Sequence, residues 1–155
     1  MLKALEKTHQ QAAPAVSSFL CDQVAALLSC DPGVRAGERN ASGGMTAAAG
    51  RVWSVLGDRR LFDRTAVDGL RAELAWLFEA LGPLSHSAPV HDPTRPLHPA
   101  TARGSEYGAA YDRALAALES DRYFRLVAEL QQFCSAPPVR QPRRSHLYGR
   151  HLYRG

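Results

Sequence analysis

The chain has 155 residues, 45% of them hydrophobic, which is enough to bury the core of one compact domain. Neither a run of about 18 consecutive apolar residues nor an apolar leader at the N-terminus occurs, so the sequence predicts no membrane span, no secretion signal and a cytoplasmic location. The net charge is +4, but five of the nineteen basic residues follow residue 139, and the remaining fourteen face fifteen acidic residues in an almost neutral body.

Apolar residues recur at three- and four-residue steps between residues 16 and 28, a pattern that predicts a helix over about 14–30 after a short lead of residues 1–13. The run Asp31–Gly33 contains proline and glycine and is expected to end it. After a glycine-rich loop, Ser42 is a candidate N-cap for a second helix. The apolar stripe of that helix is Met45, Ala48, Ala49, Val52 and Leu56.

The clearest periodic stripe predicts a third helix over about 66–81, which we expect to end at Gly82 and Pro83. Its apolar residues are Leu70, Leu74, Leu77, Phe78 and Leu81. The segment 83–99 contains five prolines and no apolar period, so it is expected to be a long loop.

Two further stripes lie between residues 107 and 134, interrupted at Ser120 and Asp121, and predict either two helices or one bent helix. No segment alternates with period two. The sequence therefore predicts an all-α fold, a bundle of four or five helices over residues 14–134, followed by a basic, disordered tail over 135–155.

Residues suited to metal binding or catalysis are present but are not arranged for either. Cys21, Cys30 and Cys134 lack the paired spacing of a zinc or redox motif and are typical of free thiols in a reducing compartment. Three histidines, His86, His91 and His98, lie in the proline-rich segment at intervals that do not fix a metal. No nucleophile motif and no phosphate-binding loop occurs, so we expect no metal, no cofactor and no enzymatic activity.

Seventeen of the basic residues are arginine, whose guanidinium group binds phosphate through two parallel hydrogen bonds. Many of them stand three or four positions from an acidic residue, as Arg125 does from Glu129. Such arginines can equally form exposed ion pairs along a helix. The arginine pattern alone leaves both alternatives open.

Three runs of the sequence resemble, in order and spacing, the first half of CHAD domains, a family of helical domains named for a conserved histidine. The resemblance covers about residues 15–138. Its residues are Asp31, Pro32, Val34 and Arg35; Leu70, Arg71, Glu73, Leu74, Trp76, Leu77, Leu81 and Gly82; and Ala114, Leu118, Ser120, Arg122, Tyr123 and Leu126 before Pro137 and Pro138.

The resemblance implies a helical bundle whose basic inward surface binds inorganic polyphosphate or a similar polyanion without catalysis, in the cytoplasm and in association with polyphosphate granules. The positions that it carries over are Arg35, Arg51, Arg71 and Arg122. The family's His-Met-Arg signature falls on Gly43, Met45, Thr46, Gly50, Arg51 and Trp53, so only Met45 and Arg51 are retained. A second landmark, in which arginine and aspartate follow a Leu-Gly pair, is occupied by Ser85 and His86.

These departures predict weak polyanion binding in a truncated or divergent member of the family. They leave open an alternative, a structural or interaction bundle that has lost anion binding. A homodimer that rebuilds the usual two-bundle arrangement is a further expectation. Nucleic acid is expected to bind only nonspecifically, through the basic tail.

Overall fold

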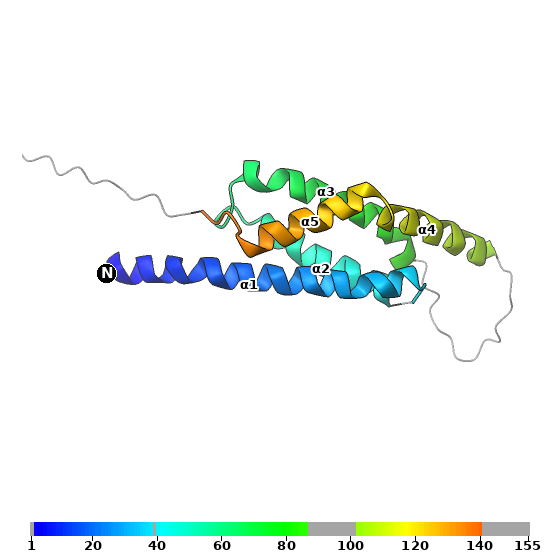
Figure 1. Cartoon of the computed structure of the whole chain (residues 1–155), viewed down its shortest axis with the longest axis horizontal. Helices are drawn as coiled ribbons and strands as arrows, with labels where there is room; N and C mark the ends of the chain where they lie inside the picture. Colours follow the sequence, from blue (N-terminus) through cyan, green and yellow to red (C-terminus); the bar gives the residue numbers. More distant parts are fainter. Residues whose placement is uncertain (1, 39, 87–101, 141–155) are drawn as a thin grey trace, which may run out of the picture.

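The computed structural model describes residues 2–38, 40–86 and 102–140, and these residues form a bundle of five helices without a strand (Figure 1). The all-α prediction is therefore confirmed. The helices are α1 (Leu2–Arg35), α2 (Ala41–Leu56), α3 (Arg64–His86), α4 (Ala102–Leu118) and α5 (Asp121–Ser135). Helix α3 contacts α2, α4 and α5, and α5 contacts α1, α3 and α4, so these two helices have the most neighbours among the described elements.

Helix α1 is longer than predicted at both ends and contains Pro14 and Pro32. The prediction that the helix stops at Asp31–Gly33 is wrong because tertiary contacts hold the last turn: Val34 is buried in the core and Asp31 is bound by two side chains. The chain turns instead at Gly37, whose φ is +75°. The backbone N–H groups of Gly37 and Glu38 donate to the carbonyls of Val34 and Gly33, the pattern of a Schellman motif.

Helix α2 begins after Asn40, and Ser42 lies buried inside the helix instead of capping it. The predicted stripe of α2 is confirmed, since Met45, Ala48, Ala49, Val52 and Leu56 are all buried. Gly44, in the first turn of α2, lies close to α1, because a Cβ atom at this position would be only 2.9 Å from the Sγ atom of Cys30.

Helix α3 continues through Gly82 and Pro83 to His86, so the predicted stop at these residues is wrong. Leu84 is buried and continues the apolar stripe beyond the glycine, which explains why the helix persists. The first residues of the predicted proline-rich loop are thus helical. His91 and His98 lie outside the described residues.

The break between the last two helices is confirmed. Ser120 adopts an extended backbone conformation as the N-cap of α5, and its hydroxyl accepts a hydrogen bond from the backbone N–H of Tyr123 at 3.3 Å. The buried stripe of α5 consists of Tyr123, Leu126, Leu130 and Cys134. Leu126 lies in the core, whereas its neighbour Val127 is only partly buried.

The predicted basic tail begins with residues that contact the bundle. The backbone N–H of Arg140 donates to the carbonyl of Leu61 at 2.7 Å, and its guanidinium binds Asp63. The rest of the tail, residues 141–155, lies outside the described residues.

Within the described residues, one stretch, Ala12–Arg35 of α1, is long and apolar enough to cross a membrane, with a mean hydropathy of 1.3. Core helices of soluble proteins have the same property, and this stretch places Leu20, Val24, Leu27 and Val34 in the core of the bundle. The cytoplasmic location stays a prediction.

Candidate anion-binding site

Arg35, at the end of α1, is held by the protein itself. Its guanidinium binds the Asp31 carboxylate at 2.5 Å and the backbone carbonyl of Leu118 at 2.8 Å. The other carboxylate oxygen of Asp31 accepts a hydrogen bond of 2.6 Å from the hydroxyl of Tyr123. Burial, followed by this hydrogen bond, raises the pKa of Tyr123 well above its ordinary value. Arg35 thus joins α1 to the junction of α4 and α5.

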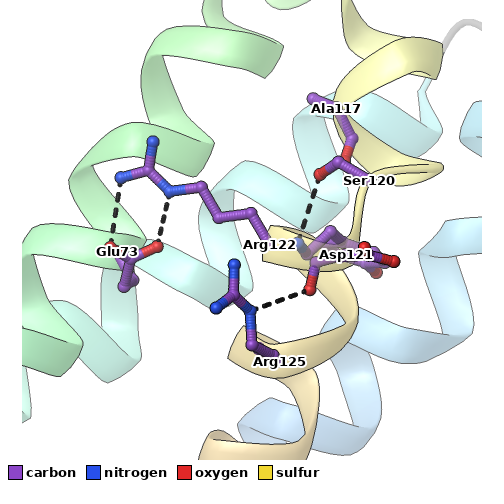
Figure 2. A network of polar contacts seen from close by, with 7 residues as sticks. Glu73, Ala117, Ser120, Asp121, Arg122 and Arg125 are labelled. Carbon is purple, nitrogen blue, oxygen red and sulfur yellow. Dashed lines mark hydrogen bonds and ion pairs between the residues drawn. The ribbon is translucent and has the colours of Figure 1, made fainter.

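Arg122 likewise has a carboxylate partner. Figure 2 shows its side chain reaching from α5 to Glu73 on α3, where two nitrogens donate to the two carboxylate oxygens at 2.7 and 3.1 Å. The guanidinium also lies 4.4 Å from the ring centre of Trp76. The hydrogen bond from Arg122 lowers the pKa of Glu73, which keeps the carboxylate ionised and the pair intact.

Arg71 and Arg51 have other partners. The guanidinium of Arg71 stacks 4.0 Å from the ring centre of Trp53, against the carboxyl end of α2, where a Cβ atom at Gly57 would lie 3.2 Å from its Nη2 atom. Its Nε atom is buried without a hydrogen-bond partner among the described residues. Arg51 is exposed and donates to the side chain of Gln23 at 3.2 Å.

The four arginines predicted from the sequence occupy different helix contacts. Arg51 lies between α1 and α2, Arg71 between α2 and α3, and Arg122 between α3 and α5, while Arg35 faces the end of α4. Each of the four therefore has a partner of its own, and their joint role in anion binding stays a prediction.

A different group of arginines surrounds an open hollow of about 400 Å³ at the amino end of α3. We call it the α3-end hollow, and its lining residues are Arg59, Phe62, Asp63, Arg64, Thr65 and Arg140. They come from the loop between α2 and α3, from the first turn of α3 and from the segment after α5. Figure 1 shows that this loop and the end of α5 lie at the same end of the bundle.

The charge of the α3-end hollow favours an anion. Three arginines and one aspartate line it, a formal charge of +2. The backbone of α3 points its positive dipole end at the hollow, although the Asp63 carboxylate, on the residue just before the helix, offsets part of it. Arg140 binds Asp63 at 2.5 Å, but both side chains are more than half exposed, and such a pair contributes little stability.

Arg59 and Arg64 are exposed and have no carboxylate partner among the residues that the structure describes. Sequence reasoning missed this cluster. One signal was local, because Arg59, Arg60 and Arg64 lie within six residues. Arg140 could not have been added from sequence, since only the fold returns the chain from α5 to the α2–α3 loop.

No candidate metal centre is found in the described ranges, where no three His, Cys, Asp or Glu side chains come together. Two of the three histidines considered above lie outside those ranges, so the absence of metal stays a prediction.

These features define a small helical bundle with an arginine-lined surface hollow. A sequence model of the CHAD domain family matches residues 18–154, and the chain belongs to this family. The match extends beyond the region of about 15–138 in which the sequence resemblance was seen, and it includes all six residues of the α3-end hollow. No curated protein and no solved structure matches the chain.

Proposed function

We propose that this chain is a non-enzymatic module that binds inorganic polyphosphate or a similar polyanion, and that the α3-end hollow is its binding site. CHAD domains are known to bind polyphosphate, which supports the class of ligand. The observation that carries the choice of site is the meeting of Arg59, Arg64 and Arg140 around one open hollow at a helix N-terminus. A cytoplasmic role beside polyphosphate granules belongs to the same proposal.

The chemistry of the hollow suits a chain of phosphates. Each guanidinium offers donors in a planar fork that matches two phosphate oxygens, and it stays charged at any working pH. Backbone N–H groups at the start of α3 add donors that carry no side-chain entropy cost. Because the hollow is open, a linear polyanion can cross it without threading through the protein.

The affinity is expected to be modest. Three arginines neutralise only a few phosphate charges, so few counterions are released and binding depends weakly on salt. The ion pair with Asp63 reduces the attraction further until phosphate oxygens replace that carboxylate on Arg140.

A second candidate function, an interaction bundle that does not bind anions, has its own support. Arg35 and Arg122 are bound to carboxylates, which an anion would have to displace before it could use these arginines. The ring of Phe124 is 55% exposed on α5, in a shallow surface depression with Asp121, Arg125 and Ala128. An exposed aromatic ring of this kind is common in protein contact surfaces.

Binding of long-chain polyphosphate to three forms of the full-length chain distinguishes the two. In Arg59→Ala with Arg64→Ala we expect the affinity to fall at least about tenfold, because each charged hydrogen bond contributes about 1.5–3 kcal/mol. The control, Arg113→Ala with Arg125→Ala, removes the same charge from exposed positions elsewhere and should change the affinity by less than about twofold. Equal losses of affinity in the two variants would mean that polyphosphate is held by general electrostatic attraction and not at the α3-end hollow. An intact chain that does not bind polyphosphate would favour the interaction bundle.

A further inference from the structure

Two of the three cysteines meet in space although 113 positions separate them in the chain. The Sγ atoms of Cys21 on α1 and Cys134 on α5 lie 2.7 Å apart. This separation is only about 0.7 Å longer than a disulfide bond. The third cysteine, Cys30, is a free thiol that packs against Gly44 at the contact between α1 and α2.

The contact between α1 and α5 holds the two sulfur atoms in place. One turn before Cys21, the hydroxyl of Ser17 donates to the backbone carbonyl of Cys134 at 2.6 Å. Leu20 and Leu130 beside them are buried in the core. Cys134 is itself buried, whereas Cys21 is partly exposed and therefore open to a small oxidant from solvent.

We propose that Cys21 and Cys134 are a redox pair that forms a reversible disulfide between the first and the last helix. The oxidant is a peroxide, and a dithiol reductant restores the thiols. This inference is independent of anion binding.

The accessibility of the two sulfurs assigns their roles. Cys21 gives up its proton and its thiolate attacks one oxygen of hydrogen peroxide, so that the S–O bond forms and the O–O bond breaks; the departing hydroxide takes up that proton and leaves as water, and Cys21 becomes a sulfenic acid. The sulfur of Cys134 then attacks that of Cys21, an S–S bond replaces the S–O bond, and a second water leaves with the proton of Cys134. The two sulfurs lose two electrons in total, and the peroxide gains them.

Burial, followed by the hydrogen bond shared with Cys21, raises the pKa of Cys134 to about 11, so this residue stays a thiol until a sulfenic acid forms beside it. The disulfide ties α5 to α1 across 113 positions of chain, and a link of this length strongly restricts the unfolded state. The oxidised protein is therefore the more stable form.

The test uses the full-length chain, first reduced and then exposed to hydrogen peroxide, with free thiols alkylated after denaturation. We expect one alkylated cysteine, Cys30, and a peptide that links Cys21 to Cys134. The melting temperature should rise by at least about 5 °C on oxidation and return when a dithiol is added. A chain that keeps three free thiols, forms sulfinic acid alone, or links Cys30 or a second molecule would overturn the proposal.

Matched variants make the result specific. Cys30→Ser should keep both the crosslink and the thermal shift, whereas Cys21→Ser should lose both. Because Cys21 is partly exposed, its replacement is expected to leave the fold intact, unlike a change at buried Cys134. A peroxide-dependent rise in melting temperature that persists in Cys21→Ser would show that another reaction causes it.

Discussion

A polar network around the carboxylate of Asp31 joins α1, α4 and α5. The carboxylate accepts from the guanidinium of Arg35, one turn further along α1, and from the hydroxyl of Tyr123 on α5. The hydroxyl of Tyr111 on α4 donates to the backbone carbonyl of Arg35. Such a network stabilises a structure only while each polar group keeps its partner, because a buried group without one carries a desolvation cost.

Replacing Tyr123 by phenylalanine tests this network. We expect Tyr123→Phe to lower the free energy of unfolding by about 1–3 kcal/mol at pH 7, because Asp31 loses one of its two donors. Chemical denaturation measures the change. The control, Tyr111→Phe, removes a hydrogen bond to a neutral carbonyl and should cost less, about 0.5–1.5 kcal/mol.

The Tyr123→Phe variant should also change how the stability of the protein depends on pH. The pKa of Tyr123 is raised in the folded state, so its stabilising contribution is complete below the unfolded value of 10.0 and is lost as the pH rises above it. The wild-type protein should therefore lose stability more steeply between pH 9 and about pH 11 than Tyr123→Phe. Parallel pH profiles for the two proteins would show that ionisation of Tyr123 does not contribute.

At the scale of whole helices, the ends were harder to predict than the interiors. The predicted apolar stripe of α2 is confirmed, and so is that of α3 apart from Phe78, which is only partly buried, because the 3.6-residue period can be seen in the side chains alone. Proline and glycine at residues 32–33 and 82–83 are local signals for a helix end, and tertiary burial of Val34 and Leu84 overrides them. The end of α1 is set instead by Gly37, which alone among the described glycines has a positive φ.

Two glycines that differ in backbone conformation test this account of the end of α1. Gly37→Ala should lower the free energy of unfolding by about 1–2 kcal/mol, because an alanine at φ +75° is strained. Its new methyl group would meet only Tyr111 at 3.8 Å, an ordinary contact, so the cost comes from the backbone. Thermal or chemical denaturation measures the loss.

The control lies in the first turn of α2. Gly43→Ala places a methyl group in open space on a helix and should raise stability by about 0.5–1 kcal/mol. If both alanine variants were stabilised, the Schellman motif at Gly37 would not be what ends α1 in solution.

For the molecule as a whole, the candidate site depends on contacts that sequence does not display. The resemblance to the family implied a site on Arg35, Arg51, Arg71 and Arg122, whereas the fold gives each of these residues a partner of its own, a carboxylate for two of them. Arg140 was grouped with a basic tail because nothing in its local sequence shows that it binds Asp63, 77 positions earlier. Whether Arg140 meets Asp63 depends on how the chain after α5 runs back to the loop between α2 and α3.

This difference allows tail charge and site charge to be separated. Deleting residues 141–155 removes Arg143, Arg144, Arg150 and Arg154 and takes the net charge from +4 to 0. It leaves Arg140 and the α3-end hollow in place. If the hollow is the site, the shortened chain should keep polyphosphate affinity within about threefold at moderate salt, where attraction to distant charges is screened. Loss of all binding would assign the polyanion to the tail.

The decisive comparison is made in the shortened chain. Arg140→Ala removes one donor and also leaves the Asp63 carboxylate unpaired in the hollow, whose formal charge falls from +2 to +1. Arg113→Ala removes the same charge from an exposed position on α4. Polyphosphate titration should therefore show at least about a tenfold loss for Arg140→Ala and less than about a twofold loss for Arg113→Ala. Equal effects of the two changes would mean that the polyanion responds to net charge, because only a site at the amino end of α3 distinguishes one arginine from the other.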